Sequence, residues 1–217
     1  MGGRRFVAER RRDPFYREAQ RRGLRSRAAF KLAFLADRFP LFAPGARVLD
    51  LGAAPGGWSL VALERTSPGG TVVAVDPRPV DPAPNLRYVP GRVGDPSLAE
   101  RLGPEPFDVV IADLSPRISG AWATDHARSA ALVIAAAELA HEVLRDGGAF
   151  VAKIFDGDLR PEVEDRLARW FRSVARTKPP ASRSQSSELY LVARGHRTDR
   201  PERRSGSPRD PIYRNVP

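Results

Sequence analysis

The stretch VLDLGAAPGGWSL, residues 48–60, runs from an apolar segment through a glycine-rich turn into a helical pattern. The apolar segment suits a buried strand, and the glycines after it let the backbone come close to a ligand. In open parallel sheets, ligands bind at the C-terminal ends of the strands, where this turn would lie. The turn is neither a GxGxxG fingerprint nor a P-loop, because no Gly-Lys-Ser/Thr follows. It predicts a nucleotide-like ligand beside Gly52, Gly56 and Gly57.

Six further runs along the chain have the length and composition of strands: TVVAVD (71–76), LRYVPG (86–91), FDVVIADL (107–114), GAFVAKIF (148–155), SVARTK (173–178) and SELYLVARG (187–195). Helical patterns cover residues 26–39, 58–66, 97–102, 125–144 and 161–170. The first five of the seven strands lack polar–apolar alternation, as expected of strands covered on both faces. Strands that alternate with helices predict an α/β fold with a parallel, doubly wound sheet.

The composition suits one folded domain in a reducing compartment. The chain has 217 residues, 41% of them hydrophobic, which is enough for a sizeable core. It has no apolar run of ~18 residues and no secretory signal, so we expect a cytoplasmic protein without a membrane partner. Cysteine is absent, which excludes disulfides and thiolate chemistry. The three histidines lack paired metal-ligand spacing, so no metal site is expected.

The net charge of +10 is concentrated at the two ends of the chain. Residues 1–31 carry +8 and residues 194–217 carry +4, whereas the chain between them carries −2. Such a one-sided excess indicates a polyanionic partner, first of all nucleic acid, and arginine forks suit phosphate. We therefore predict three parts: a basic binding segment at residues 1–25, a folded domain at residues 26–195, and a basic, disordered tail at residues 196–217.

Two carboxylates stand where predicted strands end. Asp76 ends TVVAVD, 20 positions after Gly56, where a carboxylate can accept hydrogen bonds from ribose hydroxyls. A turn aspartate is the alternative, but strand position and spacing together favour ribose binding. Asp113 closes the strand in IADLSP, and Glu188 begins the last strand.

Lys153 lies inside the apolar run GAFVAKIF. Of the 36 lysines and arginines in the chain, only Lys31, Lys153 and Lys178 are lysines. A lysine can lose its proton in suitable surroundings, whereas an arginine cannot. A lysine that only reaches solvent from a strand end is the alternative, but a chain so biased towards arginine would place arginine there. We therefore predict a chemical role for Lys153, next to Asp113 if their strands are adjacent.

Five stretches resemble the FtsJ (RrmJ-type) ribosomal RNA 2′-O-ribose methyltransferases, in that family's order: DPFYREAQRRGLRSRAAFKL, VLDLGAAPGGWS, IADLSPRISG, GGAFVAKIFDG and KPPASRSQSSELYLVARG. The resemblance implies a Rossmann-like S-adenosylmethionine-dependent methyltransferase fold. Its sheet would have seven mostly parallel strands, an antiparallel last strand and helices on both faces. The family's catalytic Lys-Asp-Lys-Glu tetrad falls on Lys31, Asp113, Lys153 and Glu188, and its S-adenosylmethionine contacts fall on Gly56, Trp58, Asp76 and Asp113.

The sequence departs from the family at two positions. The family's Gly-Asp-Phe, whose aspartate helps to hold the adenine, is Gly91-Arg92-Val93 here. Asp95, three residues later, is the candidate substitute. Arg117 stands where the family usually has asparagine, and it would add a phosphate contact near the substrate.

The resemblance also implies the reaction and the partner. The chain would methylate the ribose 2′-hydroxyl of a uridine in large-subunit ribosomal RNA, as a monomer acting on that RNA or on the ribosomal subunit. DNA is excluded because it lacks the 2′-hydroxyl. Two alternatives stay open: a 2′-O-methyltransferase of transfer RNA or of a capped end, and an inactive methyltransferase fold that binds RNA or assists ribosome assembly.

Lys153 has two possible roles in such a reaction. Burial and the charge of Lys31 would favour the neutral amine, which can take the proton of the hydroxyl. Asp113 and Glu188 would favour the ammonium, which can orient the hydroxyl and stabilise a developing oxyanion. The RNA itself would be held by residues 1–25, which include Phe15 and Tyr16 among their arginines, and by Lys178 in the loop before Glu188.

Overall fold

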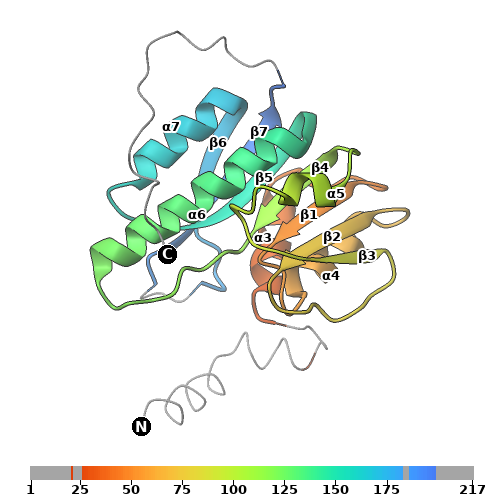
Figure 1. The fold of residues 1–217 in the computed structure, drawn as a ribbon, viewed down its shortest axis with the longest axis horizontal. Helices are drawn as coiled ribbons and strands as arrows, with labels where there is room; N and C mark the ends of the chain where they lie inside the picture. Colours follow the sequence, from red (N-terminus) through yellow and green to blue (C-terminus); the bar gives the residue numbers. More distant parts are fainter. Residues whose placement is uncertain (1–20, 22–25, 183–185, 199–217) are drawn as a thin grey trace.

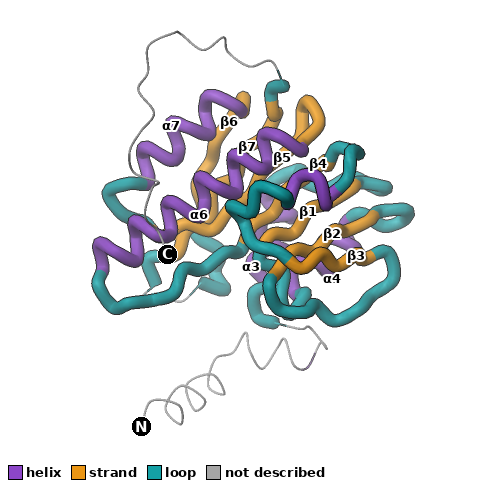
Figure 2. Tube along the Cα trace, in the orientation of Figure 1, coloured by secondary structure: helices purple, strands orange, loops and turns teal. Residues whose placement is uncertain are grey.

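The computed structural model describes residues 21, 26–182 and 186–198, and it contains a central sheet with helices on both faces (Figure 1, Figure 2). The helices are α3 (Ala29–Arg38), α4 (Gly57–Arg65), α5 (Leu98–Leu102), α6 (Trp122–Val143) and α7 (Arg160–Trp170). The strands are β1 (Arg47–Leu51), β2 (Thr71–Asp76), β3 (Leu86–Pro90), β4 (Phe107–Ala112), β5 (Leu144–Phe155), β6 (Phe171–Thr177) and β7 (Glu188–His196).

The seven strands lie in the order β3-β2-β1-β4-β5-β7-β6. Neighbours from β3 to β5 pair in parallel, and β7 pairs antiparallel with both β5 and β6. This confirms the predicted fold class, including the antiparallel last strand. The chain leaves β1 towards β2 and β3 and then crosses back to β4, so the strand order reverses between β1 and β4. Open α/β sheets bind their ligands at such a reversal, outside the carboxyl ends of the strands.

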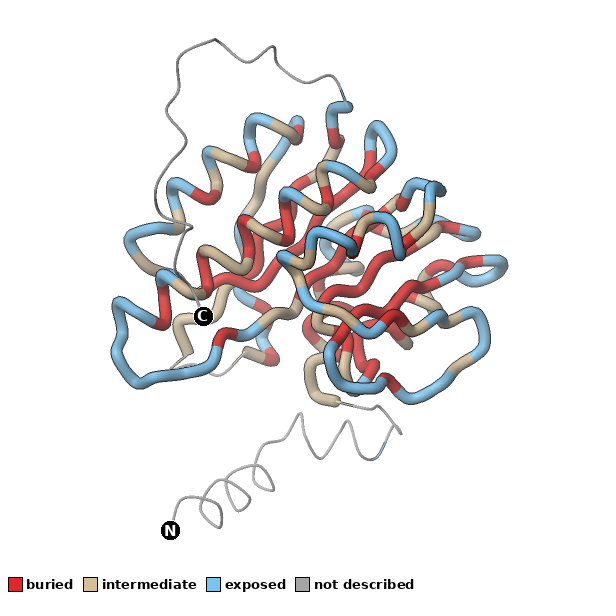
Figure 3. The backbone as a smooth tube through the Cα atoms, viewed as in Figure 1, coloured by how far each residue is buried: buried red, intermediate tan, exposed pale blue. Residues whose placement is uncertain are grey.

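Successive residues of each inner strand are buried on opposite faces of the sheet. Val48 packs in the cluster that includes α3 and α4, whereas Leu49 and Leu51 pack in the cluster that includes α5, α6 and α7. Because side chains alternate between faces, a strand covered on both sides must be apolar at nearly every position. Figure 3 shows the result, with buried residues gathered along the strands and exposed ones on the connections.

Most predicted elements agree with the structure to within a few residues. The largest difference lies at the start of β5, which begins at Leu144 rather than at residue 148. Leu144 was expected to end the preceding helix, but it pairs with Phe107, and the register of the two strands shifts before Val109. An apolar residue after a helix suits either element, and here strand pairing decides.

Two predicted parts fall mostly outside the described residues. The basic segment at residues 1–25 is described only at Arg21, and the tail only at residues 196–198. His196 ends β7, one residue beyond the predicted end of the domain. Among the residues that the structure describes, no helix combines the length and the apolar character needed to cross a membrane.

Candidate active site

The turn after β1 depends on two glycines with positive φ. Gly52 has φ 79°, and a Cβ there would lie 2.8 Å from Cδ2 of Leu114. Gly56 has φ 104° and caps the N-terminus of α4. L-residues with side chains rarely adopt these conformations, so glycine is needed at both positions. The turn thereby brings backbone close to the point where the strand order reverses.

A cavity of about 360 Å³ opens at this edge of the sheet. It is lined by residues that follow or end β1, β2, β3 and β4: Gly52, Ala54, Val75, Asp76, Pro77, Arg78, Gly91, Arg92, Val93, Asp113, Leu114 and Ser115, with Leu132 from α6. Gly52, Asp76 and Asp113 are thus the predicted site residues that lie on the cavity. The Asp76 carboxylate is held in place by the backbone amides of Ala54 and Arg78, at 3.1 and 2.8 Å.

Three other residues predicted to contact the cofactor do not line this cavity. Gly56 caps α4, as described above. Gly57 packs against Ser26, and a side chain at Gly57 would collide with it. The indole Nε1 of Trp58 donates to the carbonyl of Ala28 at 2.8 Å, and its ring lies 5.7 Å from that of Tyr190. Gly57 and Trp58 therefore fix the start of α3 against α4.

Asp95 also lies off the cavity. One of its oxygens accepts hydrogen bonds from the backbone N and the Oγ of Ser97, at 2.9 and 2.8 Å. The other oxygen lies 3.4 Å from Arg101. These contacts place Asp95 at the start of α5, while Arg92 lines the cavity wall together with Gly91 and Val93.

Strand register brings the predicted tetrad together. Ala112 pairs with Ala152, so the next residues, Asp113 and Lys153, lie beside each other. Lys153 in turn pairs with Tyr190. Glu188 begins β7 opposite the last residue of β5, because β7 runs antiparallel and starts at the edge where β5 ends.

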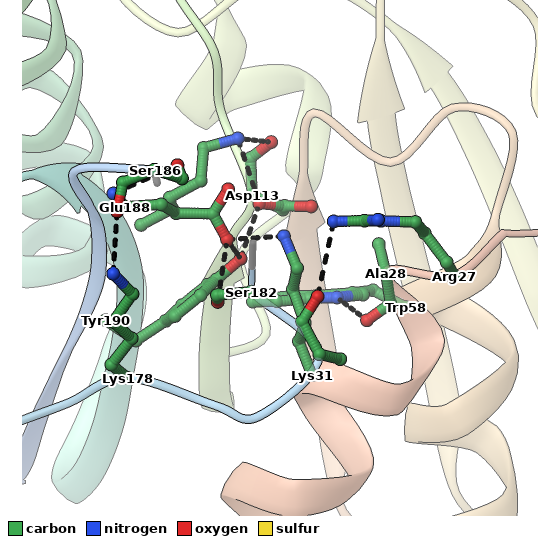
Figure 4. Close-up of polar contacts among 12 residues, drawn as sticks. Arg27, Ala28, Lys31, Trp58, Asp113, Lys178, Ser182, Ser186, Glu188 and Tyr190 are labelled. Carbon is green, nitrogen blue, oxygen red and sulfur yellow. Dashed lines mark hydrogen bonds and ion pairs between the residues drawn. The ribbon is translucent and has the colours of Figure 1, made fainter. Parts of the chain in front are cut away.

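The four charged side chains form two ion pairs. Lys31 of α3 pairs with Oε1 of Glu188 (Figure 4). Nζ of Lys153 lies 3.0 Å from Oδ1 of Asp113. The two lysines are only 6% and 8% exposed. Two buried cations thus face two carboxylates, which compensates the cost of removing them from water.

Tyr190 contacts two residues of the tetrad, and the sequence did not predict it. Its hydroxyl lies 3.1 Å from Oδ1 of Asp113 and 3.0 Å from Oε1 of Glu188, so it joins the two ion pairs (Figure 4). Burial and the two carboxylates raise the pKa of Tyr190 well above its usual value, so the hydroxyl keeps its proton as a donor. A tyrosine two residues after Glu188 lies on the same face of the strand as Glu188, and a buried hydroxyl needs a hydrogen-bond partner. These two facts could have indicated from the sequence that Tyr190 belongs to the site.

The carboxyl of Asp113 is ionised at neutral pH. Burial alone would raise its pKa, but the charges of Lys153 and Lys31, with the hydrogen bonds from Lys153 and Tyr190, outweigh burial and lower the pKa. The negatively charged carboxylate of Asp113 therefore lines the cavity and also contacts Lys153.

The loop before β7 is tied to the same site. Arg27 donates to the carbonyl of Ala181 at 3.2 Å, and Ser182 donates to Oε1 of Glu188 at 3.2 Å (Figure 4). The ammonium of Lys178 donates to the carbonyl of Ser186 at 2.7 Å. Within the described part of the chain, no three His, Asp or Glu side chains are arranged to hold a metal ion.

Asp50 is a fully buried carboxyl below the turn. Ser59 donates to its Oδ2 at 2.6 Å, while its Oδ1 has no hydrogen-bond partner among the described residues. Burial, reinforced by the charges of Asp113 and Asp76, raises the pKa of Asp50 to about 7, against the hydrogen bond from Ser59. The folded chain therefore binds a proton here over a pH range in which the unfolded chain does not.

Asp50 should make the protein less stable as the pH rises towards 7. The unfolded carboxyl loses its proton near its usual pKa, whereas the folded one keeps it up to about 7. The free energy of unfolding should therefore fall by up to ~1.4 kcal/mol per pH unit between these values and then level off. Urea unfolding of the wild type and Asp50→Asn from pH 4 to pH 8 measures this. The wild type should lose stability relative to the variant across that range, and parallel curves would contradict the assignment.

Tyr190→Phe should remove the donor that two carboxylates share. A hydrogen bond to a charged group contributes ~1.5–3 kcal/mol, so the free energy of unfolding should fall by about that amount. Tyr88→Phe is the matched control, because its hydroxyl donates at 3.0 Å to a neutral carbonyl, that of Asp76. Urea unfolding should give the larger loss for Tyr190→Phe. Equal losses in the two variants would show that the carboxylates do not depend on this hydroxyl.

Comparison with known proteins agrees with this geometry. The family model of the FtsJ-like methyltransferases matches residues 24–196. A relative from Acidiphilium cryptum, named ribosomal RNA large subunit methyltransferase E, is 47% identical over 191 residues, covering 86% of this chain and 84% of its own. A relative of the same name from Methanocaldococcus jannaschii is 43% identical over 199 residues, covering 88% and 81%.

The fold has a close counterpart among solved structures. A crystal structure of a ribosomal RNA methyltransferase from Plasmodium falciparum aligns with a TM-score of 0.71 and 27% identity, covering 79% of this chain and 98% of that one. The matching family model spans the whole sheet and the turn after β1. The related sequences and the related fold indicate the same family. The chain belongs to the FtsJ-like methyltransferase family.

Proposed function

We propose that the chain transfers a methyl group from S-adenosylmethionine to a ribose 2′-hydroxyl of large-subunit ribosomal RNA. Two ion pairs, Lys31 with Glu188 and Lys153 with Asp113, carry the proposal, because Asp113 also lines the cavity at the strand ends. The names of the relatives support the choice of RNA.

The cavity fits the methyl donor. S-adenosylmethionine supplies, when bound, a methyl group that its positively charged sulfur makes electrophilic. Asp76, fixed by two backbone amides at the end of β2, would accept hydrogen bonds from ribose hydroxyls. The turn at Gly52 gives backbone access, and the wall at residues 91–93 would enclose the adenine. Asp95 is occupied at the start of α5, so this wall would act through backbone and packing.

Lys153 is the group proposed to take the proton of the 2′-hydroxyl. Its amine can accept a proton only after giving up its own to solvent, and Asp113 holds it in position meanwhile. Alignment of the hydroxyl with the methyl group is the other main contribution of such a site. A buried lysine held by a carboxylate that lines the cavity would supply both.

Lys31, Glu188 and Tyr190 are proposed to support this pair. Lys31 balances the charge of Glu188, and the Tyr190 hydroxyl donates between the two carboxylates. Their positions on a helix and on a central strand make them rigid. They would keep Asp113 ionised and Lys153 aimed at the substrate.

The wider assembly is proposed from the charge pattern. Residues 1–25 and 196–217 would bind RNA phosphates around a catalytic domain at residues 26–195, which acts as a monomer on ribosomal RNA or on the ribosomal subunit. DNA would not serve, because it has no 2′-hydroxyl. A uridine is the proposed target nucleotide.

Mapping of 2′-O-methyl groups by mass spectrometry tests the function directly. Ribosomal RNA from cells with and without the protein should differ at one site in the large-subunit RNA. A difference confined to transfer RNA or to capped ends would assign another substrate. If the map is unchanged although the protein binds the cofactor, the protein is an inactive RNA-binding factor and the proposed function is wrong.

Asp76→Ala should weaken the binding of S-adenosylmethionine. Hydrogen bonds to a charged group contribute ~1.5–3 kcal/mol each, so affinity should fall at least tenfold. Asp95→Ala is the matched control and should leave affinity within about twofold, because that carboxylate faces Ser97 and Arg101. Calorimetry measures both variants. A larger loss of affinity in Asp95→Ala than in Asp76→Ala would show that Asp95 contributes to adenine recognition.

Lys153→Arg should fold and bind the cofactor but transfer almost no methyl. Arginine keeps the charge and cannot act as a base, and loss of a positioned base usually costs ~10²–10⁴-fold in rate. The assay is transfer of labelled methyl to ribosomal RNA, with a thermal melt and calorimetry as controls. Near-normal turnover by the variant would leave Lys153 as an electrostatic group only.

A further inference from the structure

The large hydrophobic side chains that the described residues expose lie on the two connections after β4 and β5. They are Ile118 and Trp122, at 60% and 56% exposure, and Leu159 at 41%. These connections follow the strands that carry Asp113 and Lys153, and Figure 3 shows the one between β4 and α6 as exposed. Single exposed apolar residues are ordinary, but these three all follow the C-terminal ends of the two strands beside the predicted site, which indicates an interaction surface.

The connection that carries Trp122 is held in a defined shape. Oδ1 of Asp125, which is buried, accepts hydrogen bonds from the backbone N and the Oγ of Ser119, both at 2.8 Å. Its Oδ2 accepts from the backbone N of Gly120 at 3.0 Å. Trp122, the first residue of α6, therefore follows a turn that hydrogen bonds hold in one conformation. The position of its backbone does not depend on a bound partner.

One side of the Trp122 ring is already stacked. His126 lies 4.0 Å away at an interplanar angle of 26°, and its Nδ1 lies 2.7 Å from the Trp122 carbonyl oxygen. Behind His126 lies Phe155, at 5.7 Å, which is the second residue after Lys153 on β5. The three rings thus run from the surface to the end of β5, with Trp122 stacked on His126 and His126 tilted at 57° to Phe155.

Two arginines flank Trp122 in the sequence. Arg117 is exposed, and Arg128, one helical turn and a half after Trp122, is partly exposed and donates to the Arg117 carbonyl at 3.3 Å. The charge of Arg128 also helps to lower the pKa of Asp125. An aromatic face next to two arginines suits a chain of stacked bases joined by phosphates.

We propose that Trp122 is a stacking platform for a base of single-stranded RNA next to the methylated nucleotide, with Arg117 and Arg128 on the flanking phosphates. This inference rests on the proposed function, since it needs an RNA substrate at the Lys153 edge. The platform recognises a π-face and a phosphate charge, so it tolerates any base. It acts on substrate binding and leaves the cofactor cavity untouched.

Fluorescence and kinetics test the platform together. A short single-stranded oligouridylate should quench the tryptophan emission of the wild type, whereas an abasic ribose-phosphate chain of the same length should not. The quenching should vanish in Trp122→Phe and persist in Trp170→Phe, the matched control, whose ring stacks on His141 instead. Persistence in Trp122→Phe would overturn the proposal.

In the methyl-transfer assay on ribosomal RNA, Trp122→Ala should raise KM about tenfold, the effect of one lost base stack, with kcat and cofactor affinity nearly unchanged. Trp122→Phe should restore most of the loss, and Trp122→Leu should not. An unchanged KM in Trp122→Ala would overturn the platform alone. Full rescue by leucine, with an effect only on assembled subunits, would make this a protein contact and also overturn it. If the wild type quenches with RNA but methylates none, the proposed function fails and the platform stands.

Discussion

Two lysine side chains that are almost removed from water determine the arrangement of the sheet edge that carries the proposed site. A buried ammonium needs a carboxylate and hydrogen-bond partners close by, or it is strongly destabilising. Here the partners come from strand ends that are distant in sequence, Asp113 after β4 and Glu188 at the start of β7, with the Tyr190 hydroxyl between them. The sheet must therefore close in its native register before the charges are satisfied.

Much of this architecture is predictable from the sequence, because each part is a local pattern. Apolar runs without alternation identify strands buried on both faces, and the glycine-rich turn marks the ligand edge. The tetrad of Lys31, Asp113, Lys153 and Glu188 follows from motif resemblance, and strand adjacency brings the last three together. What the sequence leaves open is the pairing: only the structure joins Lys31 to Glu188 and Lys153 to Asp113.

The features that escape prediction depend on packing between distant segments. Tyr190 is not predicted, because a tyrosine in an apolar strand resembles a core residue and only the structure places two carboxylates beside its hydroxyl. Trp58, expected at the cofactor, lies off the cavity lining, and its indole donates to the carbonyl of Ala28. Asp95, proposed from proximity in sequence, is turned towards Ser97. In each case residue type was informative, but side-chain direction depends on a neighbour that the sequence does not identify.

The antiparallel direction of β7 also decides where the polypeptide leaves the domain. The strand starts at the catalytic edge with Glu188 and ends at the opposite edge with His196, whose ring nitrogens lie 2.8 Å from Nδ1 of His141 and 3.1 Å from the Arg145 carbonyl. His196 therefore lies at the edge of the sheet remote from the cavity, whereas the described residues just ahead of Glu188 lie at the edge that carries Asp113 and Lys153. A probe attached at His196 would report on the far edge of the sheet, and one attached at Ser186 would report on the edge that carries the two ion pairs.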